Sequence, residues 1–226
     1  MGKRLFKFIF KVLLWFVALS VAWVLLYKYV PVPYTPLMVI RSFQSDTELE
    51  IKHDWVSITV ISEEIQLAVI CAEDQQFLNH NGFDYEAIEK AYKSNKNGYK
   101  LRGGSTISQQ TAKNAFLWPG RSWLRKGLET YFTFLIETFW SKERILEVYL
   151  NSIEMGDGVY GVQAAAAYWF NTTANDLNSH EAAAIAAILP NPRSYKASPR
   201  TQYMEARKQW ILRQMSNFGN LNLAGK

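Results

Sequence analysis

Residues 62–84, SEEIQLAVICAEDQQFLNHNGFD, join an apolar helical pattern to a pair of acids. Ser62 is a suitable N-cap because its hydroxyl can accept a hydrogen bond from the first turn, where Glu63 and Glu64 suit the positive end of a helix. Four apolar residues then recur on one helix face: Ile65, Ala68, Val69 and Ala72. The pattern predicts a buried helix that forms part of the core.

The acid pair lies at the end of this predicted helix. Glu73 comes eight positions after Ile65, just past the apolar face, so it is expected at the border between core and solvent. Partial burial raises the pKa of a carboxyl group, which suits a general base. The alternative is that Glu73 and Asp74 are solvated acids, and this segment alone favours that alternative. The Asn-Gly pair at 81–82 is expected to end the helix.

Composition limits the class of protein. The chain has 226 residues, of which 49% are hydrophobic and 15% aromatic, so it is too apolar to be disordered. Its net charge of +5 is compatible with nucleic acid, anionic lipid or a phosphate-bearing substrate as partner. Cys71 is the only cysteine, which excludes an internal disulfide and leaves a packing role.

The N-terminus resembles a membrane anchor. A basic segment precedes an uncharged apolar run, VLLWFVALSVAWVLLY at residues 12–27, which with its flanks approaches the roughly 20 residues that span hydrocarbon. A cleaved signal peptide is the alternative, but the run is long and aromatic and no small-residue cleavage site follows it. The preceding basic residues predict a cytoplasmic N-terminus. Pro31, Pro33 and Pro36 predict a stiff, extended connector.

Residues 102–114, RGGSTISQQTAKN, place a polar stripe at the start of another helix. Ser105 can cap this helix, and Ser105, Gln109 and Lys113 then share one face. Backbone N–H groups at a helix N-terminus favour anions, although the spacing of a P-loop is absent. A capped surface helix is the alternative, but such a face is more often rich in Glu and Lys.

Cationic and apolar residues alternate in the next segment. The cations are Lys113, Arg121, Arg125 and Lys126, and the apolar residues are Phe116, Leu117, Trp118, Trp123 and Leu124. We expect the apolar residues to be exposed and to contact a membrane surface with its phosphate headgroups. A nucleic-acid surface is the alternative, and the anchor argues against it.

Residues 125–140 predict one more helix, with Glu129 four positions after Arg125. Its apolar face would consist of Leu128, Phe132, Leu135 and Phe139, and a second face of Glu129, Thr133 and Glu137. A simple surface pair between Arg125 and Glu129 would contribute only tenths of a kcal/mol.

Five stretches in order resemble one enzyme family. Between about Asp54 and Tyr195 they are EDQQFLNHNGFD, GGSTISQQTAKN, RKGLE, KERILEVYLNSIEMGDGVYGVQAAAAYWF and EAAAIAAILPNPRSY. Together they resemble the family 51 peptidoglycan glycosyltransferases, in particular the monofunctional biosynthetic type of Gram-negative bacteria. Each stretch is moderately specific and the ordered set is strongly so. Trp169 within AYWF departs mildly from the family pattern.

The resemblance implies the reaction. The family polymerises lipid II, a disaccharide-pentapeptide on undecaprenyl pyrophosphate. The 4-hydroxyl of the acceptor's N-acetylglucosamine attacks the anomeric carbon of the donor's N-acetylmuramic acid, the configuration inverts, and the lipid pyrophosphate leaves. The implied fold is all-α and lysozyme-like, preceded here by one transmembrane helix. The body of the domain shows no convincing strand pattern, in agreement with that fold.

The resemblance also implies roles for single residues. Glu73 matches the general base, and Glu129 matches a second glutamate that assists at the donor site. The matching pyrophosphate-binding cations are Lys113, Arg121, Arg125 and Lys126, and the matching polar residues of the donor site are Ser105, Gln109 and Gln110. The motif residues expected to be structural are Asp74, Phe77, His80, Gly82 and Asn151.

The expected organisation follows from the anchor and the motifs. It consists of a basic cytoplasmic tail at residues 1–11, a transmembrane anchor at 12–30, a connector at 31–53 and a periplasmic glycosyltransferase domain at 54–226. The expected location is the bacterial inner membrane, crossed once. Bifunctional relatives carry a penicillin-binding transpeptidase as well, and the absence of S-x-x-K and K-T-G predicts that cross-linking activity is lacking.

The expected partners follow from the same resemblance. They are lipid II, the nascent glycan strand and the membrane, with penicillin-binding proteins and divisome or elongation proteins as further candidates, and no nucleic acid. The sequence shows no dense carboxylate–histidine cluster, so no metal ligand is assigned. A divalent cation, Mg²⁺ or Mn²⁺, stays open as a cofactor.

Two other functions fit part of these features. A lysozyme-like hydrolase or lytic transglycosylase would also place a glutamate in a glycan cleft, but it would not need an anchor beside a cation cluster. A membrane-anchored scaffold with a degenerate active site is the other alternative. The presence of every motif residue argues against it.

Overall fold

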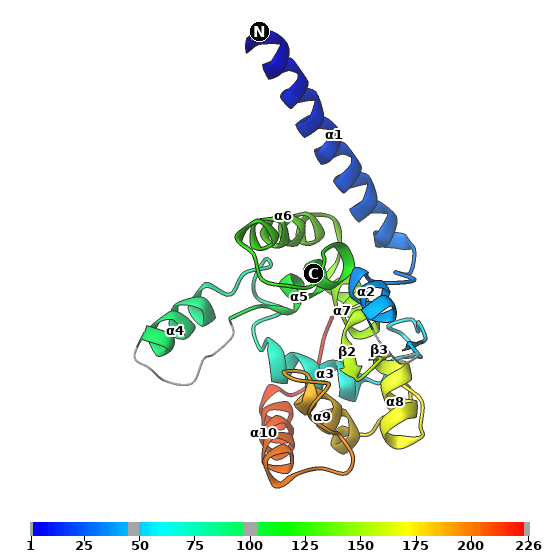
Figure 1. Cartoon of the computed structure of the whole chain (residues 1–226). Helices are drawn as coiled ribbons and strands as arrows, with labels where there is room; N and C mark the ends of the chain where they lie inside the picture. Colours follow the sequence, from blue (N-terminus) through cyan, green and yellow to red (C-terminus); the bar gives the residue numbers. More distant parts are fainter. Residues whose placement is uncertain (1, 45–49, 97–103, 224–226) are drawn as a thin grey trace.

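Helices dominate the structure, a computed structural model that describes residues 2–44, 50–96 and 104–223. The first helices are α1 (Gly2–Tyr29), α2 (Pro36–Gln44), α3 (Glu63–Glu73), α4 (Tyr85–Lys96) and α5 (Ile107–Phe116). They are followed by α6 (Trp123–Phe139), α7 (Lys142–Ser152), α8 (Val162–Phe170), α9 (Ser179–Ile188) and α10 (Gln202–Phe218). The expectation of a helical fold with an N-terminal apolar helix is confirmed, and α1 projects away from the other elements (Figure 1).

Helix α1 has the dimensions of a membrane span. Among the described residues it is the one helix that is long and apolar enough to cross a bilayer. Its 28 residues correspond to about 42 Å, more than the roughly 30 Å of a hydrocarbon core. Ser20 and Val24 are its buried residues, and most of its other side chains are exposed. It therefore does not resemble the core helix of a water-soluble domain.

Helix α3 lies in the core, where it packs on α9 and α10 (Figure 1). The Ser62 hydroxyl accepts a hydrogen bond from the Glu64 N–H at 3.2 Å, as the sequence predicts. Ile65, Ala68 and Val69 of the predicted face are fully buried, and Ala72 is partly buried. The predicted end at residues 81–82 is wrong, because the helix stops at Glu73 and Asp74 has non-helical backbone angles.

Helix α5 packs between α6 and α7. Its N-cap is Thr106 and not Ser105, and Thr106 forms a capping box with Gln109. Phe116 at the far end of α5 stacks on Phe132 of α6 with ring centroids 4.7 Å apart. These contacts fix α5 at both ends, so its side chains occupy defined positions.

A small sheet that the sequence did not predict joins the connector to the domain. Its strands are β1 (Lys52–His53), β2 (Glu154–Gly156) and β3 (Val159–Tyr160), in the order β1-β3-β2. Strand β1 runs parallel to β3, so Lys52 and His53 of the expected connector pair with the domain. The expectation of an extended connector is wrong in part, because Pro36 opens α2, a position that suits proline.

Asn151 ties the start of the domain to α7. Its side-chain oxygen accepts a hydrogen bond from the Val56 N–H, and its side-chain nitrogen donates one to the Val56 carbonyl, both at 2.9 Å. The residue is fully buried. Gly161 approaches the same place so closely that an added Cβ would lie 2.8 Å from the Asn151 carbonyl oxygen.

Gly82 lies at a close contact between the loop after α3 and helix α6. Its φ is +88°, and a Cβ added there would lie 2.8 Å from Thr133 Cγ2. Its carbonyl accepts a hydrogen bond from the Thr106 hydroxyl at 2.7 Å. Both the backbone angle and the lack of space therefore require glycine.

We predict that Gly82→Ala lowers the free energy of unfolding by about 1–3 kcal/mol, because the side chain adds strain and a steric clash. The matched control is Gly127→Ala in α6, where nothing lies within 4 Å of the added Cβ. That variant should gain about 0.5–1 kcal/mol, because alanine favours a helix interior. Thermal unfolding of the full chain in detergent measures both, and equal melting temperatures would contradict the assignment of strain to Gly82.

Candidate active site

The end of α3 and the start of α5 meet at one carboxylate. Asp74 Oδ2 accepts a hydrogen bond from the Ile107 backbone N–H at 2.9 Å. His80 Nε2 lies 3.0 Å from both Asp74 oxygens, and His80 Nδ1 accepts the Gly82 N–H at 3.0 Å. Because Nδ1 is an acceptor, Nε2 carries the ring hydrogen and donates a hydrogen bond to Asp74. A negative side chain at a helix N-terminus is also favoured by the helix dipole.

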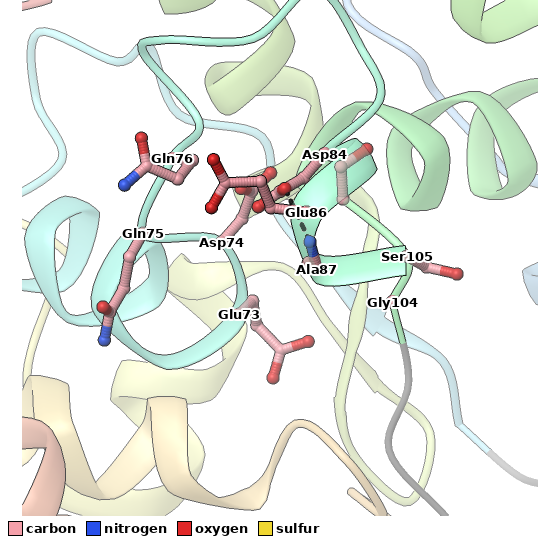
Figure 2. A pocket seen from close by; sticks show the side chains of 10 residues that line it. Glu73, Asp74, Gln75, Gln76, Asp84, Glu86, Ala87, Gly104 and Ser105 are labelled. Carbon is pink, nitrogen blue, oxygen red and sulfur yellow. Dashed lines mark hydrogen bonds between the residues drawn. The ribbon is translucent and has the colours of Figure 1, made fainter. Parts of the chain in front are cut away.

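Glu73 lies next to this junction and faces a pocket of about 290 Å³. The pocket is also lined by Ser105 and Thr106, and Figure 2 shows the Glu73 side chain at the end of α3. The Glu73 carboxylate accepts a hydrogen bond from Gln110 Nε2 at 3.0 Å. Glu73, the base expected from the sequence, thus lies at the wall of a cavity and accepts a hydrogen bond from an uncharged donor.

The surroundings of Glu73 change its acidity. Burial raises the pKa of the carboxyl group above its ordinary value of 4.5, and the charge of Asp74 adds to the rise. The hydrogen bond from Gln110 and the charges of Arg207 and Lys113 lower it in part. Burial is the largest of these effects, so Glu73 binds a proton more readily than a solvated glutamate does, which favours a role as a base.

Tyr149 is a residue of this site that the sequence analysis missed. Its hydroxyl lies 3.4 Å from Gln110 Oε1, and the residue is fully buried in α7. Burial, with Glu73 and Asp74 nearby, raises the pKa of the phenol well above its ordinary value, so it stays a donor. With the Gln110 oxygen turned to Tyr149, the Gln110 amide nitrogen faces Glu73. Tyr149 lies within the quoted ILEVYLN stretch, but its spacing gives no sign of this contact.

A second pocket, of about 360 Å³, lies at the other end of α5. Its cationic lining residues are Lys113, Arg121 and Arg125, and its apolar lining includes Leu37 and Trp118. Burial lowers the pKa of Lys113, the charge of Glu129 raises it, and Arg125 and Lys126 lower it again. The structure thus brings three of the four predicted cations together around one cavity, and Lys126 does not line it.

Glu129 holds two of these cations. Arg125 Nη1 donates to one Glu129 carboxylate oxygen at 2.9 Å, and Lys126 Nζ contacts the other. The Arg125 side chain is 11% exposed and that of Glu129 5%, so the alternative of a surface pair is wrong. Among the described residues, Arg125 Nε has no hydrogen-bond partner. It is therefore a buried donor whose hydrogen-bonding capacity is not used within the part of the chain that the structure describes.

A buried polar cluster next to Phe77 was also missed. Glu137 of α6 accepts hydrogen bonds from the Ser108 hydroxyl and from Lys142 Nζ, the latter at 2.8 Å. The Lys142 ammonium lies 4.7 Å from the centre of the fully buried Phe77 ring. The cluster connects α5, α6 and α7 behind the loop that follows Glu73.

Some predicted site residues have other surroundings. Gln109 is buried, and its side-chain oxygen accepts the Thr106 N–H at 3.0 Å, so it closes the capping box. Ser105 is exposed and lines the Glu73 pocket and not the cation pocket.

The predicted exposed apolar segment is only partly exposed. Phe116 and Leu117 are buried in the core, which contradicts the expectation for them. Trp118, Trp123 and Leu124 are exposed, with Trp123 at 93%. Within the described ranges, no group of three or more His, Cys, Asp or Glu side chains is arranged to hold a metal ion.

Comparisons with known proteins identify relatives of the chain. A family model described as Transglycosylase matches residues 40–216. A protein of Bacteroides thetaiotaomicron named biosynthetic peptidoglycan transglycosylase is 54% identical over 95% of this chain and 88% of its own length. Proteins with the same name from Bdellovibrio bacteriovorus and Pseudomonas putida are each 53% identical, covering 93% and 92% of this chain and 85% and 90% of their own lengths.

We predict that Glu73→Gln raises the melting temperature at pH 8. The raised native pKa means that the native state keeps a proton which the unfolded chain releases, so stability falls as the pH rises from 4.5 through the native pKa. Glutamine avoids this cost and can still accept the Gln110 hydrogen bond. The gain over the wild type should disappear below about pH 4.

The control for this measurement is Glu63→Gln at the exposed start of the same helix, which should change the melting temperature much less. A Glu73→Gln variant that is less stable than the wild type at pH 8 would contradict the assigned effect of burial.

Proposed function

The chain belongs to the transglycosylase family, and we propose that it is a peptidoglycan glycosyltransferase that polymerises lipid II. The acceptor's 4-hydroxyl oxygen forms a bond to the donor's anomeric carbon, and the bond from that carbon to the undecaprenyl pyrophosphate breaks. The hydroxyl proton passes to a base, and the α-linkage of the donor becomes β. No transpeptidase step is assigned, because S-x-x-K and K-T-G are absent from the sequence.

Glu73 is the proposed base. Its carboxylate faces a cavity beside the helix junction and has a pKa raised by burial, which suits proton transfer near neutral pH. Gln110 holds one carboxylate oxygen, so the other is available for the acceptor hydroxyl. Asp74 and His80 are proposed to be positioning residues, because their hydrogen bonds fix the chain immediately after Glu73.

The cation pocket is the proposed site of the lipid pyrophosphate. Lys113, Arg121 and Arg125 line it, and the Arg125 Nε–H, which has no partner among the described residues, is a donor that an anion can use. A pyrophosphate there would offset the burial of the Lys113 ammonium and stabilise the charge that develops as the donor bond breaks. Glu129 keeps Arg125 and Lys126 in place, which is the donor-site assistance proposed for it.

The observation that carries the proposal is the position of the two sites on α5. Gln110, near the middle of this ten-residue helix, contacts Glu73, and Lys113 at its end lines the cation pocket. Gln110 and Lys113 are three residues apart, a rise of about 4.5 Å along the helix, so the proposed base and the cation pocket are neighbours on one element. A glycan hydrolase would need the first site but not the second.

The anchor and the exposed tryptophans support a location at the membrane. We propose that α1 crosses the inner membrane once, with the N-terminus in the cytoplasm and the catalytic domain in the periplasm. Trp118 lines the cation pocket, and Trp123 and Leu124 are exposed between Arg121 and Arg125. Such residues suit the interface where a lipid pyrophosphate lies. Protein partners, such as penicillin-binding or divisome proteins, are candidates only.

We predict that Glu73→Gln lowers the single-turnover rate of lipid II polymerisation by at least about a hundredfold, since a positioned base is lost. Glu63→Gln is the control and should polymerise like the wild type. The measurement is the growth of glycan from labelled lipid II by the full chain in detergent. Near-normal turnover by Glu73→Gln would remove Glu73 from the role of base.

We predict that Trp118→Ser combined with Trp123→Ser lowers activity on full-length lipid II in bilayers more than on a short-chain analogue in detergent. The reason is that both side chains are exposed beside the cation pocket and are proposed to contact lipid. Trp210→Ser in α10, a residue 39% exposed, is the matched control and should leave the ratio of the two activities unchanged. An equal loss on both substrates would assign the membrane contact to α1 alone.

A further inference from the structure

The last turns of α1 are packed against the catalytic domain. The Ser20 hydroxyl lies 2.7 Å from the Tyr131 hydroxyl of α6, and Ser20 and Val24 are buried. Trp23 packs edge-on against Phe116 with ring centroids 5.4 Å apart. Figure 1 shows the lower end of α1 beside the helices of the domain, while its other end is free. The anchor is therefore joined to the domain by side-chain packing as well as by the chain.

Side chains of the domain also bind the backbone carbonyls at the end of α1. Trp140 Nε1 donates to the Val24 carbonyl at 2.9 Å. The Arg144 guanidinium donates to the Tyr27 carbonyl at 2.8 and 3.1 Å and to the Val30 carbonyl at 2.7 Å. The Tyr27 carbonyl is one of the last four of α1, which lack partners within the helix, and a cation at this end is favoured by the helix dipole.

Arg144 is held in place for these contacts. A third nitrogen, Nη1, donates to Glu147 at 2.8 Å, and the guanidinium lies 5.3 Å from the centre of the Trp55 ring. The Arg144 side chain is 13% exposed. The desolvation of such a cation is costly, and here several charge-assisted hydrogen bonds offset it. This differs from a mobile arginine on a surface, which rarely orders its partners.

We propose that Trp140 and Arg144 form a carbonyl clamp that makes α1 and the catalytic domain one rigid unit, with Arg144 as a positioning residue. The clamp lies at the corner between α6 and α7, and α6 carries Arg125 and Glu129 near its other end. Fixing α1 to this corner fixes the height and tilt of the cation pocket over the membrane. This inference rests on the proposed function, because height matters only if the substrate's pyrophosphate lies at the headgroup level.

The contribution of the clamp to the reaction is orientation. Misplacement of reacting groups by about 1 Å can cost up to a hundredfold in rate. If the clamp were absent, the chain between Tyr29 and α2 would act as a hinge, and the cation pocket would sample many heights above the bilayer. The clamp therefore favours delivery of the lipid-bound donor to Lys113 and Arg121.

The direct test is a distance measurement between spin labels at Lys11→Cys and Asn175→Cys in the full chain, in lipid nanodiscs. Both positions are exposed, whereas the native Cys71 is buried and should not react. The parent chain should give a narrow distance distribution. Arg144→Ala should give one about twice as wide, because the segment after α1 becomes a flexible linker. Arg144→Lys should give an intermediate width, because lysine lacks the planar fork.

Matched variants separate the clamp from general loss of structure. Arg193→Ala removes an arginine paired with Asp157 on the surface and should leave the distribution narrow. Trp140→Phe removes only the indole donor and should widen the distribution less than Arg144→Ala does. The melting temperature of each variant should stay within a few degrees of the parent. A broad distribution in the parent, or a narrow one in Arg144→Ala, overturns the clamp.

The effect of the clamp on the rate of polymerisation is tested in the same nanodiscs with lipid II. Arg144→Ala should polymerise about tenfold more slowly than Arg193→Ala. A wider distribution with an unchanged rate would show that Arg144 joins the two parts without positioning the reaction, which overturns its assigned role. Failure of the parent chain to polymerise lipid II would contradict the proposed function, while the distance distributions would still decide whether the clamp exists.

Discussion

The hydrogen bond from the Ile107 backbone N–H to the Asp74 carboxylate is the contact on which the site depends. It joins the C-terminal end of α3 to the N-terminal end of α5, two elements that are 33 residues apart in the chain. The same carboxylate holds His80, and the loop then returns to α5 through the bond between the Gly82 carbonyl and Thr106. Because Glu73 directly precedes Asp74, this junction fixes the position of the proposed base relative to Gln110. A buried charge is tolerated here because both a helix N-terminus and an imidazole compensate it.

Helix α5 carries this arrangement to the second site. One of its sides holds Gln110 against Glu73, and its last turn places Lys113 where the charges of both Glu73 and Glu129 act on it. Burial raises the proton affinity of Glu73 and lowers that of Lys113, so each group is less stable in its charged form before substrate arrives. Uptake of the hydroxyl proton would neutralise the buried Glu73 carboxylate. An anionic leaving group would stabilise the buried Lys113 ammonium. The packing of α5 between α6 and α7 keeps the two sites at a constant separation.

The sequence predicted the parts of this account that depend on periodicity or on single side chains. The buried face of α3 and the apolar run of α1 extend over enough residues to be recognised. The Ser62 cap is recognised because serine is a preferred N-cap residue. The strands were missed because they contain two or three residues, too few to show alternation. Thr106 followed by Gln109 three residues later has the pattern of a capping box. The sequence therefore does indicate that Thr106, and not Ser105, is the N-cap of α5. Tyr149 contacts Gln110, which is 39 positions away in the chain, and Arg144 contacts the end of α1, 114–117 positions away. No local sequence pattern predicts contacts over such separations.

The stoichiometry of the reaction with purified lipid II tests most directly whether the chain polymerises glycan. The full chain, reconstituted in bilayers, is incubated with lipid II, and the released undecaprenyl pyrophosphate is counted against the new glycosidic bonds. We expect one lipid pyrophosphate to be released for each new glycosidic bond. A muramidase specific for β-linkages should digest the product back to disaccharide units. Shortening of preformed peptidoglycan without any release of lipid pyrophosphate would contradict the account.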